Sequence, residues 1–282
     1  MSTSELICQA PAKLNLFLHI TGQRADGYHN LQTVFQLIDL CDTLTFNTAG
    51  LPAGLLSLAC DDPAVPLDDN LILQAAEKLR DSVSKPGLAA EISLRKRIPM
   101  GGGLGGGSSD AATTLLALNT LWQLGLSLEE LMAIGLELGA DVPVFILGRC
   151  AWASGVGEQL KPLDLPPRHY IVVWPGIAVS TGHIFSHQQL TRDSSAIKIA
   201  DFLAGRSRND CENVVRNLYP QVDEALNWLS QFGDARLTGT GSCVFAGFDS
   251  LDTAQKILVQ VPDRMQGFLA SGLNRSPALS RV

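Results

Sequence analysis

Apolar and polar residues alternate along the first part of the chain. The apolar positions that share one face are Ala12, Leu14, Leu16, Leu18 and Ile20, and the positions between them are Lys13, Asn15, Phe17 and His19. A period of two residues predicts a half-buried β-strand. Because successive side chains of a strand point to opposite faces, we expect Lys13 and Asn15 to project from the same face.

Two further strands are predicted in the first half. A loop over 22–30, with Asp26-Gly27 as its turn signal, separates the first strand from an apolar run over 34–45. Residues 92–98 alternate again, but this strand carries Arg95, Lys96 and Arg97. Such a basic strand is unlike the nearly continuous apolar strands of a parallel sheet.

Helical spacing marks three segments. A helix is predicted over 71–80, capped by Asp69 or Asn70. Ser108 or Ser109 is expected to begin a long helix that ends at Gly125. Its apolar stripe consists of Ala111, Leu115, Leu118 and Trp122. Ser127 begins a capping box for a helix that ends at Gly139.

The second half predicts an α+β arrangement. A Pro- and Leu-rich segment over 162–167 indicates a crossing between two domains, 1–161 and 162–282. After it, the pattern predicts strands over 170–174, 243–248 and 268–273, and helices over 213–232 and 251–260.

Composition narrows the class of protein. The 282 residues are 46% hydrophobic and 17% charged, which is typical of a globular chain. No run approaches the roughly 18 apolar residues of a membrane span, and residues 1–9 lack a targeting pattern, so we expect a soluble, cytoplasmic protein. The six cysteines are scattered and are expected to be reduced thiols. A net charge of −7 argues against nucleic acid or a membrane as partner.

The most informative segment is glycine-rich. Six of the 26 glycines fall within 101–107, directly before the predicted long helix. Glycines let backbone N–H groups approach a ligand, and a helix N-terminus adds unpaired donors and a positive dipole end. The segment therefore predicts a phosphate site, to which the Ser108 and Ser109 hydroxyls could contribute.

Other phosphate-binding motifs fit less well. Gly101, Gly103 and Gly106 formally satisfy the dinucleotide fingerprint, but the polar strand before them argues against that fold. No Lys follows the last glycine, so the P-loop motif is absent, as are the protein-kinase motifs. His183 and His187 have helical spacing without a recognisable third ligand, so no metal site is assigned.

Three segments of the chain resemble a known superfamily, that of galactokinase, homoserine kinase, mevalonate kinase and phosphomevalonate kinase. The resemblance rests on residues 11–17, 99–109 and 237–243. Within the superfamily, residues 22–29 and 138–145 are similar to the kinases of 4-diphosphocytidyl-2-C-methyl-D-erythritol. The similarity runs from about residue 10 to 277.

The resemblance implies a fold and a reaction. The fold is a two-domain α/β (α+β) architecture, with an N-terminal nucleotide-binding domain and a ferredoxin-like C-terminal domain. The reaction is Mg²⁺-dependent transfer of the ATP γ-phosphoryl group to the 2-hydroxyl of the small-molecule substrate diphosphocytidyl-methylerythritol, in the non-mevalonate route to isoprenoids. We expect a monomer or a weak homodimer.

The resemblance also implies catalytic and substrate-binding residues. Asp141 is the expected base for the hydroxyl proton, and Lys13 keeps Asp141 ionised and polarises the hydroxyl. Asn15 is expected to contact the substrate or orient Lys13. Tyr28 and Phe185 are expected to sandwich the cytosine.

His29 is expected to hydrogen-bond the edge of that base. Thr181 is a weaker candidate, because many relatives have Pro where this chain has Gly182. A second glycine turn, which in the superfamily closes against the phosphate loop and the substrate, comprises Gly239, Thr240 and Gly241.

The expected ATP site includes Asn70 near adenine and Lys96 near adenine or phosphate. The expected phosphate loop consists of Pro99, Met100, Gly101, Gly102, Gly103, Leu104, Gly105, Gly106, Gly107, Ser108 and Ser109. Three alternatives remain: another kinase of the superfamily, a catalytically silent nucleotide-binding protein, and a nicotinamide oxidoreductase, which the polar strand disfavours.

Overall fold

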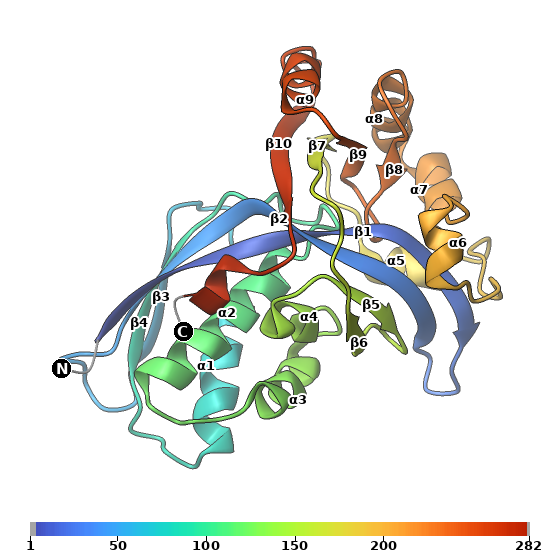
Figure 1. The fold of residues 1–282 in the computed structure, drawn as a ribbon. Helices are drawn as coiled ribbons and strands as arrows, with labels where there is room; N and C mark the ends of the chain where they lie inside the picture. The colour runs from blue at the N-terminus through green and yellow to red at the C-terminus, as the bar shows by residue number, and fades with distance from the viewer. Residues whose placement is uncertain (1–3, 281–282) are drawn as a thin grey trace.

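Two long antiparallel strands run through the molecule in the computed structural model, which describes residues 4–280. They are β1 (Glu5–Gln23) and β2 (His29–Asn47), joined by a turn in which Gly27 has a φ of 87°. Figure 1 shows them crossing from the N-terminal body into the region below the upper lobe. The prediction of a half-buried β1 is wrong, because Lys13 and His19 on its polar face are only 3% and 4% exposed. Both faces of β1 are covered by other elements.

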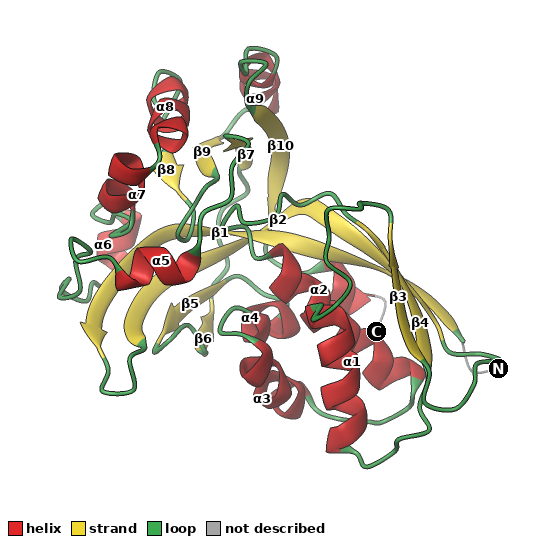
Figure 2. Cartoon of the chain, turned by 180° about the vertical axis from the view of Figure 1, so that it is seen from behind, coloured by secondary structure: helices red, strands yellow, loops and turns green. Residues whose placement is uncertain are grey.

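The N-terminal body packs helices against one side of this sheet (Figures 1 and 2). Its helices are α1 (Leu71–Ser82), α2 (Gly106–Leu121), α3 (Leu128–Leu138) and α4 (Val142–Leu147). Its other strands are β3 (Leu56–Cys60), β4 (Ala90–Arg95), β5 (Ala151–Ser154) and β6 (Gln159–Pro162). β4 pairs with one half of β2 and β5 with the other.

Helix starts follow local capping chemistry, with one exception. Asn70 caps α1, and Ser127 and Glu130 form the capping box of α3, as predicted. The prediction that Ser108 or Ser109 begins α2 is wrong, because the cap is Gly105, whose φ of 73° favours glycine. The helix ends at Leu121 rather than at Gly125, and residues 109–118 are buried on all sides rather than along one stripe.

The C-terminal lobe is a four-stranded antiparallel sheet with helices. Its strands are β7 (His169–Trp174), β8 (Arg236–Leu237), β9 (Val244–Phe248) and β10 (Gln266–Leu273), in the order β10-β7-β9-β8. Its helices are α5 (Thr181–Ser186), α6 (Ile199–Leu203), α7 (Glu212–Leu218), α8 (Pro220–Leu229) and α9 (Leu251–Leu258). The strand order is that of a ferredoxin-like fold, as expected. The predicted helix over 213–232 is two helices, because Pro220 begins the second.

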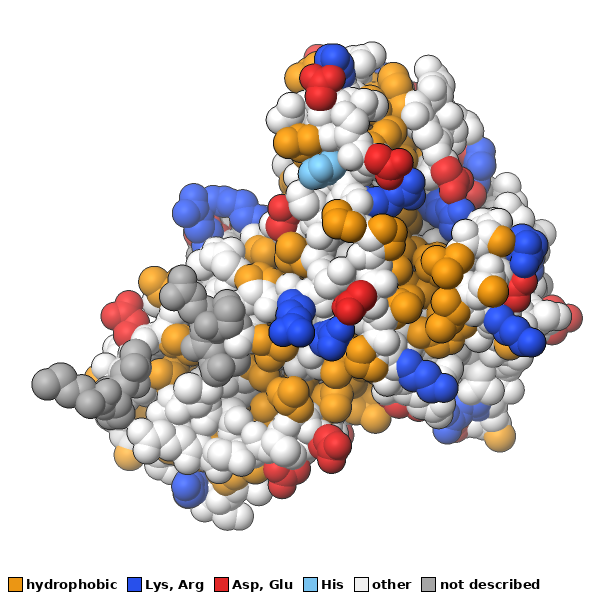
Figure 3. Space-filling model, viewed as in Figure 1, with side chains coloured by type: hydrophobic (Ala, Val, Ile, Leu, Met, Phe, Trp, Pro, Cys, Tyr) orange, Lys and Arg blue, Asp and Glu red, His pale blue; other side chains and the backbone are white. Residues whose placement is uncertain are grey.

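The lobe and the body are joined through β10. Gly272 and Leu273 of β10 pair with Ile38 and Leu37 of β2, so the chain forms one continuous sheet. The final turn η1 (Pro277–Ser280) returns to the N-terminal body, where Ala278 is buried in the main core. Figure 3 shows apolar side chains gathered where the lobe meets the body.

Residues 1–3, which begin the segment inspected for a targeting signal, lie outside the described residues, as do residues 281–282. None of the helices in the described part of the chain combines the length and apolar character needed to span a bilayer.

Candidate active site

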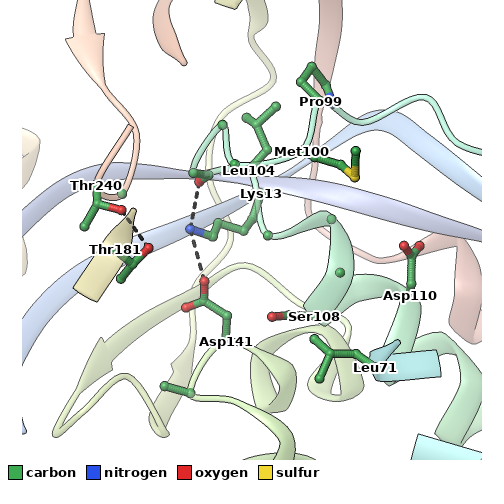
Figure 4. A pocket seen from close by; sticks show the side chains of 18 of the residues that line it. Lys13, Leu71, Pro99, Met100, Leu104, Ser108, Asp110, Asp141, Thr181 and Thr240 are labelled. Carbon is green, nitrogen blue, oxygen red and sulfur yellow. Dashed lines mark hydrogen bonds and ion pairs between the residues drawn. The ribbon is translucent and has the colours of Figure 1, made fainter. Parts of the chain in front are cut away.

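A cavity of about 610 Å³ lies between the N-terminal body and the C-terminal lobe. Its walls come from β1, the glycine loop and the start of α4 in the body, and from α5 and the 239–240 turn in the lobe. Figure 4 shows Lys13 and Asp141 facing each other here, with Thr181 and Thr240 to the left of this pair. This size is typical of small-molecule sites.

The carbonyl groups of the glycine loop accept hydrogen bonds from neighbouring segments of the protein. Gly101 O and Gly102 O accept bonds from the backbone N–H groups of Ser242 (3.2 Å) and Cys243 (3.0 Å), and Leu104 O accepts from Lys13 N–H (2.9 Å). The first N–H groups of α2, which begins within this loop, have no partner inside the helix. Backbone donors at the start of α2 are therefore available for an anion in the cavity.

Close packing explains why the loop contains glycine. A Cβ on Gly103 would lie 2.3 Å from the Thr238 carbonyl oxygen, and one on Gly105 would lie 2.9 Å from the Phe145 ring and 3.1 Å from Lys13 Cε. Both glycines have positive φ, 74° and 73°. Gly103 also lies against Gly239, so the two glycine turns meet, as the superfamily resemblance implies.

Lys13 and Asp141 form an ion pair at the cavity wall. Lys13 Nζ lies 3.3 Å from Asp141 Oδ2, and it donates to Asn15 Oδ1 (2.6 Å) and Gly103 O (3.0 Å). The Lys13 side chain is 3% exposed, whereas that of Asp141 is 36% exposed. Asp141 occupies the N-cap of α4 but makes no side-chain capping bond, which leaves its carboxylate facing the cavity.

Asn15 orients Lys13 rather than standing free. Its Oδ1 accepts from Lys13, and its Nδ2 donates to Thr33 Oγ1 (3.0 Å). Its backbone N–H donates to Thr238 Oγ1 (3.0 Å). The period-two prediction that Lys13 and Asn15 share a face is confirmed by the bond between them.

Lys96 is held by two buried carboxylates. Its ammonium group donates to Asp42 Oδ2 (2.6 Å) and Asp110 Oδ2 (2.8 Å), and the carboxylates are 0% and 4% exposed. Asp42 Oδ1 also accepts from the backbone N–H groups of Arg97 (2.6 Å) and Ile98 (2.9 Å). Burial raises the pKa of Asp110 to about 7, although the Lys96 charge opposes this. Lys96 lines the cavity, but its charge is already compensated.

Sequence reasoning missed Asp42. The available signal was a carboxylate within the apolar run 34–45 of a predicted strand. Such a residue is rarely buried without a partner.

The expected adenine end of the cavity lies beside α1. Asn70 lines it, but its Oδ1 accepts from Ile72 N–H (3.0 Å) as the helix cap. Val65, Leu71 and Leu94 add apolar surface there. In the phosphate loop, residues 99–108 line the cavity, whereas Ser109 is fully buried, with no hydrogen-bond partner for its Oγ among the described residues.

At the opposite end, the structure brings His29 and Phe185 together. Their ring centroids are 5.2 Å apart with an interplanar angle of 33°, and Phe185 lines the cavity. Tyr28 is 64% exposed at the β1–β2 turn and does not line the cavity, so the expected pair of Tyr28 with Phe185 is not assembled here. Burial, and secondarily Arg192, lower the pKa of His29.

The second glycine turn contributes a hydroxyl pair. Thr181 Oγ1 and Thr240 Oγ1 lie 3.0 Å apart, and both residues line the cavity. Gly239 lines it as well, whereas Gly241 packs against Leu237 and Val215 behind the turn. With Gly182 after it, Thr181 lies at the cavity wall.

Sequence models of two domains match the chain. The model described as GHMP kinases N terminal domain matches residues 70–149, and the GHMP kinases C terminal model matches residues 188–267. Together they cover more than half of the described chain.

Individual proteins are similar along nearly the whole length. A 4-diphosphocytidyl-2-C-methyl-D-erythritol kinase of Nitrosococcus oceani is 53% identical over 271 residues, which are 96% of each chain. One of Pseudomonas paraeruginosa is 55% identical over 267 residues, which are 95% of this chain and 94% of that protein.

Solved structures agree in fold. A crystal structure of 4-(cytidine 5'-diphospho)-2C-methyl-D-erythritol kinase superposes with a TM-score of 0.80 at 33% identity, covering 95% of this chain and 99% of that one. A mevalonate kinase at 17% identity, with a TM-score of 0.71, shares the fold alone. From the matches to both domain models and the long, highly identical relatives, the chain belongs to the GHMP kinases, in the family of the 4-diphosphocytidyl-2-C-methyl-D-erythritol kinases.

Proposed function

We propose that this protein transfers the γ-phosphoryl group of ATP to the 2-hydroxyl of 4-diphosphocytidyl-2-C-methyl-D-erythritol, giving the 2-phosphate and ADP. The observation that carries the proposal is the Lys13–Asp141 pair, 3.3 Å apart, beside the glycine loop in one cavity. The relatives named above support the choice of acceptor.

Asp141 is the proposed base. Its carboxylate faces the cavity and is free of helix capping, so it is available to accept a proton from a bound hydroxyl. Lys13 places a positive charge 3.3 Å from this carboxylate and is itself held in place by Asn15 and Gly103. Catalysis of phosphoryl transfer depends mainly on positioning and electrostatic stabilisation, to which Asp141 would add an acceptor for the hydroxyl proton.

The glycine loop fits the phosphates of ATP. Its carbonyls are bound to the protein, and its crowded glycines leave no room for side chains on the loop. The backbone N–H groups at the start of α2 and the Ser108 hydroxyl would hold the phosphates. The Ser108 hydroxyl would also bind Mg²⁺ or a water molecule on it. Bound Mg²⁺ and ATP supply, respectively, charge neutralisation and the phosphoryl group.

The remaining assignments follow from position. Asn70 and the apolar surface beside it would receive adenine, and the His29–Phe185 pair would receive cytosine, with Tyr28 brought over the base from the β1–β2 turn. Thr181, Gly239 and Thr240 would contact the substrate between these ends. We propose domain limits of 1–161 and 162–282, with the 277–280 turn packed back on the first domain, a cytoplasmic location, and a monomer or weak homodimer.

The test is ADP release from Mg-ATP with each of three acceptors: diphosphocytidyl-methylerythritol, mevalonate and homoserine. Turnover with the first alone is the expected result. Turnover with another acceptor would retain the phosphate site but reject the cytidine site. ATP binding without turnover of any of the three would favour a non-catalytic role.

A further inference from the structure

Arg192 is the centre of a hydrogen-bond network beside the cavity. It lies in the loop between α5 and α6, and its Nε donates to His29 Nε2 at 3.1 Å. The rest of its guanidinium donates to three backbone carbonyls, those of Phe185 (2.8 Å), His187 (2.9 Å) and Leu190 (3.1 Å). One side chain therefore joins the start of β2 to the end of α5.

The bond to His29 determines which ring nitrogen carries hydrogen. An arginine donates and never accepts, so Nε2 of His29 must be the unprotonated nitrogen. A neutral ring with an unprotonated Nε2 carries its hydrogen on Nδ1. Burial and the adjacent guanidinium both lower the pKa of His29, which keeps the ring neutral.

The Nδ1–H group is free to donate to a ligand. No protein partner for this nitrogen occurs within residues 4–280. The ring packs against Phe185, which lines the cavity at the end where the proposed function puts the cytosine. A base stacked at Phe185 would meet a hydrogen-bond donor of fixed type.

We propose that Arg192 is a positioning residue that fixes the Nδ1–H form of His29, so that this site selects a pyrimidine whose ring nitrogen accepts a hydrogen bond. Cytosine presents such an acceptor at N3, whereas uracil presents an N3–H donor. The choice of cytosine as the bound base rests on the proposed function. The position of the hydrogen on the His29 ring rests only on the bond between Arg192 and His29. Arg192 acts through His29 and is not itself a catalytic residue.

A first experiment observes the ring without substrate. In ¹⁵N-histidine-labelled protein, the imidazole ¹⁵N–¹H spectrum identifies which nitrogen of His29 carries hydrogen, with assignment by loss of the signal in His29→Gln. We expect the Nδ1–H form in the unsubstituted protein and loss of that fixed form in Arg192→Met. An unchanged His29 signal in Arg192→Met would overturn the proposal.

A second experiment measures base selection. The acceptors are diphosphocytidyl-methylerythritol and its uridine analogue, and kcat and KM are measured separately for both acceptors and for ATP. In Arg192→Met we expect KM for the cytidine compound to rise about tenfold, with kcat and the KM for ATP little changed, because one ligand hydrogen bond is lost. Discrimination against the uridine compound should fall by a similar factor.

Two further variants separate positioning from simple loop support. Arg192→Lys keeps the positive charge but loses the planar guanidinium group, which donates to His29 and to the three carbonyls at once. It should therefore behave like Arg192→Met in the spectrum and in base selection. Arg168→Met, which removes an arginine bound to Asp249 on the C-terminal lobe (3.0 Å), should change neither readout. If kcat/KM falls equally for the cytidine and the uridine compound in Arg192→Met, Arg192 only stabilises the loop between α5 and α6, and the proposal is overturned.

The design also distinguishes the two proposals. Failure of the unsubstituted enzyme to use either nucleotide compound would reject the proposed function, and with it the base selection. The spectrum of His29 would still decide whether Arg192 fixes the ring.

Discussion

Lys13 Nζ lies 3.3 Å from Asp141 Oδ2, and the two residues come from different elements of the N-terminal body, β1 and the N-cap of α4. The lysine is almost fully buried and held by two further acceptors, whereas the carboxylate is partly open to the cavity. A fixed cation therefore faces a carboxylate that a substrate hydroxyl is able to reach.

Substitution of Asp141 by Asn should lower kcat by about 10²- to 10⁴-fold, because an amide does not accept the hydroxyl proton. Steady-state kinetics measures this, and ATP binding by calorimetry should be nearly unchanged, since Asp141 is not among the groups proposed to hold the phosphates. The Asp141 side chain makes no capping bond, and Lys13 keeps Asn15 Oδ1 and Gly103 O as acceptors in this variant, so the melting temperature should also change little. Full turnover by Asp141→Asn would remove Asp141 from the role of base.

Substitution of Lys13 by Met should also lower kcat, because the ion pair with Asp141 is lost while most of the side-chain volume is kept. We expect a loss of roughly 100-fold, comparable to that of other catalytic electrostatic contacts. The double variant with Asp141→Asn should be little worse than the more impaired of the two single variants, since the two residues act as a unit. Losses that multiply in the double variant would argue that the residues act independently.

Substitution of Gly103 by Ala should destabilise the protein more than Gly50→Ala does. Both glycines have positive φ, 74° and 69°, but only the Cβ at position 103 would clash, at 2.3 Å from Thr238 O. We expect about 1 kcal/mol lost at Gly50 from conformation alone and roughly 3 kcal/mol at Gly103. Urea unfolding measures both, and equal losses would refute the clash.

Substitution of Lys96 by Met should be strongly destabilising, because it leaves Asp42 and Asp110 buried without their shared cation. Breaking a buried ion pair in this way costs about 3–5 kcal/mol. Adding Asp110→Asn to Lys96→Met should recover part of the loss, since one of the two buried carboxyl groups that lose their cation is replaced by a neutral amide. Denaturant unfolding of the two variants tests this, and a further loss in the double variant would contradict it.

Acid should weaken the folded state partly through His19. Burial lowers the pKa of this imidazole in the folded protein, although Asp210 opposes the shift. The unfolded chain then binds more protons as the pH falls below the unfolded value of about 6.5, so stability is lost on acidification. In His19→Gln the free energy of unfolding should fall less between about pH 7.5 and pH 5.5. An identical fall in both proteins would reject this assignment.

Local chemistry explains which parts of the fold were predictable. The alternation around Lys13 and Asn15, the cap at Asn70 and the capping box at Ser127 each depend on a few neighbouring residues, and each was predicted correctly. The start of α2 was not, because Gly105 caps the helix through its left-handed backbone, without a side chain. Because Ser caps helices more often than Gly does, the sequence predicted a start at Ser108 or Ser109, inside the observed helix.

Long-range contacts explain what the sequence did not reveal in the site. The Lys96 charge is taken up by Asp42, 54 positions away, and Arg192 bonds His29 across 163 positions. Neither Asp42 nor Arg192 belongs to a motif, so periodicity and spacing carried no signal for these two residues. The motif residues Lys13, Asp141 and the glycine loop were placed together only by family resemblance.

The return of the 277–280 turn to the N-terminal body has a consequence for biosynthesis. Ala278 occupies the same core as Phe17 and Leu115, which leave the ribosome far earlier, and β10 pairs with β2 just before that turn. The N-terminal body is therefore incomplete during most of translation, and its final packing depends on the last segment of the described chain to be synthesised. Release of a shortened chain would leave the β2 edge without β10 and the core without its last turn, a form suited to capture by chaperones or proteases.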